Sequence, residues 1–134
     1  MRYMLMICQD ESTVKDAEEM RSDPEGFAWF EEMDGRGLLR GGACLRPSGD
    51  ATTVRVRGEE VPSSDGPFTE SKEQMAGYNV IECADLDEAI EVASRHPVAR
   101  YGAIEVRPLW ERGRLVKVVG GRGVSKESFE RGLQ

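Results

Sequence analysis

The side chains that could transfer a proton or hold a charged ligand lie in three segments of the sequence. Asp65 opens the stretch DGPFTESKEQMAGY, which closes on Tyr78. His96 is the one histidine of the chain, so any imidazole chemistry depends on it. Glu105 and Arg107 stand two residues apart in the segment GAIEVRPL. Asp65 and His96 could act as acid and base, and Arg107 could hold a carboxylate beside Glu105. These residue types predict proton transfer on a small organic acid.

The DGPF stretch also has an interpretation without chemistry. Because a glycine and a proline follow it, Asp65 could sit in a rigid Asx-turn and accept backbone N–H groups. Lys72 either contacts a ligand or forms a solvated pair with its neighbour Glu73. Tyr78 either offers its hydroxyl to a cavity wall or packs in an interface.

His96 and Arg107 each allow two interpretations as well. His96 follows a predicted helix, where the negative end of the helix dipole is expected to raise its pKa. The structural alternative is a residue that only contacts the last carbonyl groups of that helix. Arg107 could recognise the carboxylate of a ligand, or it could pair with Glu105 or Asp65, since buried charges need partners.

The charge of the chain limits the class of partner. Its 134 residues carry 25 acidic and 18 basic side chains, a formal charge of −7. Nucleic acids require a basic face, so the sequence excludes them. A small anionic ligand is compatible, held by arginines or by a short helix expected to begin at Thr69 or Ser71. No apolar run is long enough for a membrane span, and the N-terminus does not fit a signal peptide. We therefore expect a cytoplasmic protein.

The cysteines and glycines indicate neither a metal nor a cofactor. Cys8, Cys44 and Cys83 are far apart and form no CxxC pair, which disfavours a zinc site or a disulfide framework. The glycine-rich run at residues 120–123 fits neither GxGxxG nor a phosphate-binding loop. We predict that the protein uses no metal and no cofactor, and that the cysteines are small buried strand residues.

The hydrophobic pattern predicts strands and helices in the order β-α-β-β-β-β-α-β. Expected strands cover residues 2–8, 38–48, 77–83 and 102–109, with a hairpin at 51–66 that turns at Gly58. The first strand is expected to be buried on both faces. Ser22 or Asp23 is expected to cap the first helix, and Asp85 the second. The residues expected to face the core on these helices are Phe27, Phe30, Met33, Leu86, Ala89, Ile90 and Ala93.

This order predicts an α+β fold related to the ferredoxin-like arrangement, with both helices on one face of an antiparallel sheet. The other face then requires a cover. We expect a homodimer that packs sheet against sheet, with a semi-polar cavity between sheet and loops. Residues 1–110 are expected to form this domain, and residues 111–134 a C-terminal extension that could clasp the dimer.

Several motifs together resemble the YCII-related family, in particular its DGPF-domain branch. They are the DGPF turn at 65–68, the Gly77-Tyr78 pair, the helix start DLDEA at 85–89 and the closing IEVRPL at 104–109. The segments RYMLMI and LLRGGACLRPSGDATTVRVR are also similar to the family pattern. The resemblance covers residues 1–110 and implies a dimeric α+β barrel.

The resemblance implies two classes of function. Some related proteins act on small organic acids, among them a dehydrochlorinase of a chlorinated hydroxymuconate, and others are encoded beside extracytoplasmic-function sigma factors. The suggested active site of the family is an Asp–His pair, which Asp65 and His96 would supply here. The histidine that YCII proteins proper carry earlier in the chain is absent. One expectation is thus a cofactor-independent lyase, isomerase or dehydrohalogenase, and the other a non-catalytic ligand-binding or regulatory dimer linked to a sigma factor.

Overall fold

The computed structural model describes residues 1–13, 23–60, 63–69 and 71–110. Its elements are β1 (Arg2–Asp10), η1 (Glu11–Thr13), α2 (Pro24–Gly35), β2 (Leu39–Cys44), η2 (Ser48–Asp50), β3 (Thr52–Val54), β4 (Ser63–Asp65), β5 (Glu73–Glu82), α3 (Leu86–Ser94), η3 (Pro97–Arg100) and β6 (Ala103–Pro108). The predicted order of helices and strands is confirmed. The extension predicted at residues 111–134 lies outside the described residues.

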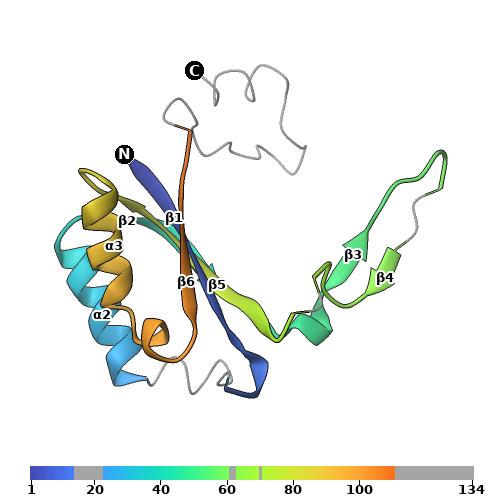
Figure 1. Cartoon of the computed structure of the whole chain (residues 1–134), viewed down its shortest axis with the longest axis horizontal. Coiled ribbons are helices and arrows are strands. Elements are labelled where there is room, and N and C mark those ends of the chain that lie inside the picture. The colour runs from blue at the N-terminus through green and yellow to red at the C-terminus, as the bar shows by residue number, and fades with distance from the viewer. Residues whose placement is uncertain (14–22, 61–62, 70, 111–134) are drawn as a thin grey trace, which may run out of the picture.

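The main sheet has four strands in the order β2-β5-β1-β6, all paired antiparallel. β1 lies inside the sheet and pairs with β5 on one side and β6 on the other. Figure 1 shows α2 and α3 together on one side of this sheet. The arrangement is the ferredoxin-like α+β fold predicted from the sequence. None of the helices in the described ranges is long and apolar enough to span a membrane.

The core lies between the helices and one face of the sheet. Tyr3, Leu5 and Ile7 of β1 are buried and join helix residues in one hydrophobic cluster. Each such side chain contributes about 1.5–3 kcal/mol by leaving water. Met4 and Met6, which point to the other face, are only partly buried. The prediction that this strand is buried on both faces is therefore wrong for the single chain, because helices cover one face alone.

The helices bury some of the side chains predicted to face the core, namely Met33, Ala89 and Ala93, and leave the others exposed. On α2 the core contacts come from Trp29 and Met33, which stand one helical turn apart. Phe27 and Phe30 remain 57% and 49% exposed. On α3 the residues Ala89, Val92 and Ala93 are buried, whereas Leu86 and Ile90 are about half exposed. Each helix is thus rotated about its axis relative to the predicted stripe.

The predicted N-caps form at both helices. Asp23 Oδ1 accepts the Glu25 N–H at 3.2 Å, and Asp85 Oδ1 accepts the Glu88 N–H at 2.9 Å. Glu88 Oε1 accepts the N–H of Ala84, the residue before the cap, at 3.1 Å, an arrangement related to the capping box. Such caps stabilise a helix by about 1 kcal/mol each, and they determine the residue at which α2 and α3 begin.

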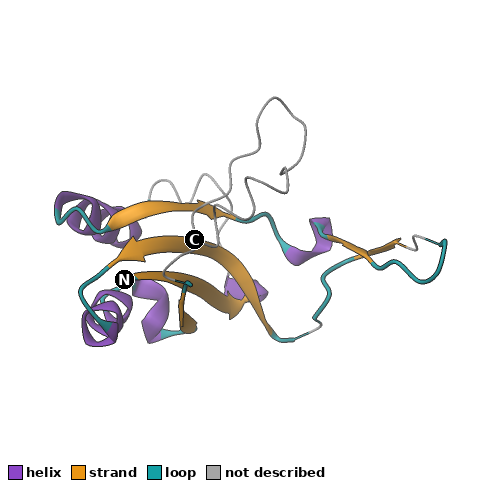
Figure 2. Cartoon of the chain, turned by 90° about the horizontal axis from the view of Figure 1, so that it is seen from above, coloured by secondary structure: helices purple, strands orange, loops and turns teal. Residues whose placement is uncertain are grey.

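The predicted hairpin forms an arm outside the main sheet. β3 pairs with β4 in a separate two-stranded sheet. Beyond β3, the backbones of Arg57 and Glu60 form an isolated antiparallel β-bridge. Figures 1 and 2 both show this arm, residues 46–60 and 63–69, projecting away from the helices and the main sheet. At its base the Glu11 carboxylate accepts hydrogen bonds from the Ser48 N–H and hydroxyl at 2.6 Å.

The short helix predicted to begin at Thr69 or Ser71 does not form in the described residues. Strand β5 begins at Glu73 instead. Gln74 Nε2 donates to the carbonyl oxygens of Thr69 and Ser71 at 2.7 and 2.8 Å. Gln74 therefore holds the backbone that leads into β5 and does not cap a helix. Without a helix start in these described residues, the predicted anion-binding set of free N–H groups does not form there.

Gly102 allows the chain to pass close to β1, and this predicts a stability effect. A Cβ at Gly102 would lie 2.4 Å from the Cys8 carbonyl oxygen and 2.9 Å from Val98 Cγ1. We expect Gly102→Ala to lower the free energy of unfolding by about 1–3 kcal/mol through overpacking. Gly49→Ala is the matched control, because nothing lies within 4 Å of its added Cβ. Equal urea midpoints for the two variants would contradict this packing account.

Candidate functional site

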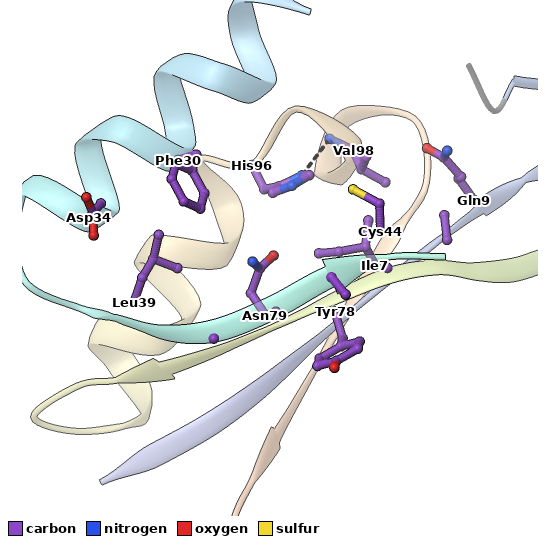
Figure 3. Close-up of a pocket in the computed structure, with 15 residues that line it drawn as sticks. Ile7, Gln9, Phe30, Asp34, Leu39, Cys44, Tyr78, Asn79, His96 and Val98 are labelled. Carbon is purple, nitrogen blue, oxygen red and sulfur yellow. Dashed lines mark hydrogen bonds between the residues drawn. The ribbon is translucent and has the colours of Figure 1, made fainter. Parts of the chain in front are cut away.

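A cavity of about 460 Å³ lies between α2, the helix-facing side of β2 and β5, and η3. Figure 3 shows the side chains around it. This volume is within the range of small-molecule sites in proteins, about 300–1,000 Å³. The polar residues among its lining are Gln9, Asp34, Cys44, Asn79 and His96. We call this space the His96 cavity.

His96 is held in the cavity wall by its ring nitrogen and its ring edge. Nδ1 accepts the Val98 N–H at 3.1 Å, which makes His96 the N-cap of η3 (Figure 3). The ring meets Trp29 edge-on, with centroids 4.8 Å apart, and the Trp29 indole donates to the Val92 carbonyl at 3.0 Å. Because Nδ1 accepts, the proton of the neutral imidazole resides on Nε2. His96 therefore offers a hydrogen-bond donor to the cavity.

The protonation of His96 differs from the prediction. Burial lowers the pKa of His96 to about 4, and the Asp23 carboxylate opposes this only in part. The predicted increase from the helix dipole is wrong, because the ring is buried and desolvation disfavours its charged form. At neutral pH the cavity thus contains an uncharged imidazole.

Gln9 supplies a buried polar group at the other side of the cavity. It occupies the next inward-facing position of β1 after Ile7 and is 5% exposed. Its Oε1 atom is buried and has no hydrogen-bond partner among the described residues. An unsatisfied buried acceptor costs about 1–3 kcal/mol, so its presence beside a cavity indicates a site where a ligand or water can donate to it.

Asn79 reaches the cavity because its neighbour on β2 is a glycine. A Cβ at Gly42 would lie 2.6 Å from Asn79 Nδ2 and 2.5 Å from the Tyr78 carbonyl oxygen. Gly42 also has φ of +154°, which disfavours any side chain. Figure 3 shows the Asn79 side chain on the cavity side of the sheet, whereas the Tyr78 ring points from the opposite face.

The structure does not bring the predicted site residues into one cluster within the single chain. Of these residues, only His96 directs its side chain into the cavity. Tyr78 lines the cavity with its backbone, because its ring points to the opposite face of the sheet. Asp65 is exposed at the end of β4 on the arm and does not line the cavity. Its carboxylate accepts no hydrogen bond from the described residues, so the Asx-turn is not observed there. Lys72 lies 3.7 Å from Asp10 on the surface, 86% exposed.

Glu105 and Arg107 form the pair predicted as the structural alternative. Arg107 Nη2 lies 2.6 Å from Glu105 Oε2, and both side chains are at least half exposed. They project from the sheet face opposite the helices, because Ile104 and Val106 of β6 pack against the core. An exposed pair of this kind contributes at most about 1 kcal/mol. In the single chain it lies across the sheet from the His96 cavity.

Sequence reasoning missed Gln9, Asp34, Asn79 and the role of Phe30. One signal was available: Gln9 is a polar residue at an inward position of an otherwise apolar period-two pattern. Phe30 was assigned to the core, yet it lines the cavity and is half exposed. Asp34 and Asn79 carry no such signal, since their placement depends on how α2 and β2 meet β5.

The cysteines differ in exposure, contrary to the prediction that all are buried. Cys44 is exposed and lines the cavity, whereas Cys83 is buried. Burial raises the pKa of Cys83 to about 11 and, with nearby carboxylates, raises the pKa of Cys8. In the described ranges no three His, Cys, Asp or Glu side chains are grouped as a metal site.

Comparison with known proteins identifies the domain. A family model described as the YCII-related domain matches residues 1–112. An uncharacterised protein of Rhizobium meliloti is 45% identical over 69 residues, which make up 50% of this chain and 56% of that protein. The match thus spans little more than half the length of this curated relative, whose name states no activity.

The buried neutral histidine predicts a specific pH dependence of stability. The pKa of His96 is about 4 in the folded chain, whereas an unperturbed histidine in an unfolded chain has a pKa of about 6.5. Between these values the unfolded chain binds a proton that the folded chain does not. Acidification from pH 6.5 to 4 should therefore lower the free energy of unfolding by up to about 3 kcal/mol, with no effect of His96 above pH 6.5.

The control for this prediction is His96→Asn, which keeps an oxygen to accept the Val98 N–H but cannot titrate. Urea unfolding of both proteins at several pH values isolates the histidine from the carboxylates that also titrate. Parallel stability curves for the two proteins between pH 6.5 and 4 would show that His96 is not buried in its neutral form.

Proposed function

We propose that this chain, which belongs to the YCII-related domain family, binds a small organic molecule in the His96 cavity. The proposal rests on one observation: a ligand-sized space lies beside a neutral His96 and a buried Gln9 Oε1 that has no partner among the described residues. Cavities that serve only packing are apolar or small, and they do not keep buried acceptors without donors. Perturbed titratable groups in a cavity also favour a functional site.

The finer predictions from the sequence stay proposals. They are membership of the DGPF branch, a cytoplasmic location, a regulatory link to a sigma factor and a sheet-to-sheet homodimer. The dimer is supported by the face opposite the helices, where Met4, Met6 and Tyr78 are only partly buried. A second copy packed there would cover these side chains and also bring charged groups such as Arg107 into an interface. The predicted anionic ligand of Arg107 and Lys72 would lie on those surfaces rather than in the cavity.

Filling the cavity mouth should abolish binding without unfolding the chain. Cys44→Phe places a large side chain on a lining position of β2, whereas Leu45→Phe changes the next residue, which does not line this cavity. Fragments can be screened by NMR through the C2 proton of the one imidazole in the chain. We expect wild type and Leu45→Phe to show the same ligand-induced shifts, and Cys44→Phe to show none.

If no fragment shifts the imidazole signal of the wild type, or if hits bind Cys44→Phe as well, the cavity is not the binding site. Circular dichroism and urea midpoints for each variant establish that the loss does not come from unfolding.

A second candidate function is a cofactor-independent lyase, isomerase or dehydrohalogenase acting on a small organic acid. It is favoured by the neutral His96, whose Nε2–H can donate to a substrate carbonyl and thereby acidify the adjacent C–H bond. A carboxylate then has to take the carbon-bound proton. Asp34 is the carboxylate that lines the cavity in the single chain; Asp65, which the sequence predicted for this role, would have to come from the arm of a second chain.

Solvent exchange at carbon tests the catalytic candidate. We expect the protein to catalyse deuterium incorporation next to the carbonyl of 2-oxobutyrate or butanone in D₂O, measured by NMR of the compound. His96→Asn and Asp34→Asn should each slow this exchange by about 10²-fold or more, and Asp65→Asn should leave it unchanged. Loss of exchange in Asp65→Asn alone would assign the base to the arm. Absence of exchange above the buffer rate for both compounds would contradict catalysis.

A further inference from the structure

The electrostatic character of the His96 cavity is unusual for a protein expected to bind organic acids. Among the described residues that line it, none is lysine or arginine. The one formal charge in the lining is the carboxylate of Asp34, and His96 is neutral because burial lowers its pKa. An anion that entered would lose hydration and meet no opposite charge among the described lining residues, which is strongly unfavourable.

The arginines described in the helical layer are paired outside the cavity. The arginines of the helical layer form ion pairs with carboxylates of α2 and α3: Arg36 with Glu91, Arg95 with Glu32 and Arg100 with Glu25. These groups hold the helices together on their solvent side. Recruitment of one of them to a ligand would break such a pair and leave its carboxylate without that partner.

Apart from the exposed Asp34 carboxylate, the polar side chains that line the cavity are uncharged and include both hydrogen-bond donors and acceptors. Gln9 contributes a buried acceptor, its Oε1, that has no partner in the described part of the chain. His96 contributes the Nε2–H donor, because its Nδ1 is occupied by the Val98 N–H. Asn79 adds a carboxamide on the sheet side (Figure 3). A ligand that satisfies this set has to carry both a donor and an acceptor.

The rest of the lining is apolar. Ile7, Leu39 and Val98 form walls that belong to the core or pack against it, and Phe30 contributes its ring from α2. Side chains of this type favour a ligand body of hydrocarbon or aromatic character through loss of water-exposed surface. Asp34, which is exposed, remains in contact with solvent, so its charge is screened.

We propose that the ligand of the His96 cavity is an uncharged molecule with an apolar body and an amide-like head. The head donates a hydrogen bond to Gln9 Oε1 and accepts one from His96 Nε2–H. This inference rests on the proposed function, because it names the ligand class of the same cavity. It differs from the anionic ligand predicted from the sequence in that no cation takes part in recognition.

Three probes of similar size and different charge test the inference: benzamide, benzoate and benzylamine. Each is titrated at pH 7.5 into the full-length chain, and binding is followed through the C2 proton of His96 and by calorimetry. We expect benzamide to bind at least about tenfold more tightly than either charged probe, since one well-placed uncharged hydrogen bond is worth about 1 kcal/mol and an unpaired charge costs more.

Gln9→Leu is the matched variant, because leucine has a similar size and leaves no buried acceptor. It should lower benzamide affinity by about tenfold and leave the stability equal or higher. If this variant misfolds, the order of the three probe affinities for the wild type still tests the inference. Benzoate or benzylamine binding as tightly as benzamide at His96 would overturn the inference while the cavity remained a binding site. No binding by any probe at millimolar concentration would overturn both the inference and the proposed function.

Discussion

The antiparallel pairing of β1 with both β5 and β6 is the constraint on which the rest of the structure depends. Because side chains alternate along a strand, this pairing gives the sheet one face for the helices and one without them. On the first face, Tyr3, Leu5 and Ile7 pack in the hydrophobic core. Gln9 continues the same face beyond the core and becomes part of the cavity. One face of β1 therefore contributes both to the core of the fold and to the candidate site.

Burial explains why His96 is uncharged in a chain of net charge −7. The ring of His96 is enclosed by Trp29 and η3, so the cost of desolvation keeps it neutral. The acidic side chains of the helices are matched by arginines at the solvent side, for example Glu91 by Arg36 at 3.3 Å. Arginines and carboxylates thus pair at the surface of the helical layer. Polar recognition of a ligand in the His96 cavity then depends on hydrogen bonds.

The sequence predicted the fold well because its signals are local. N-caps such as Asp23 and Asp85 depend on neighbouring residues, and they formed as expected. The site was predicted poorly because its members meet only through tertiary packing. The pKa of His96 depends on Trp29, 67 positions away, and the orientation of Asn79 depends on Gly42 across a strand pair. The charged residues singled out by type lie instead at the surface, where water solvates them.

The cavity combines a floor that belongs to the core with a rim that does not. Ile7 at the floor is a core residue, whereas Phe30, Asp34 and Cys44 at the rim are exposed and lie outside the core cluster. Exposed positions of this kind can change at small cost in stability. Mutation and selection can therefore replace the rim while the floor and the fold are retained, so that family members with the same architecture can diverge in the molecules they recognise.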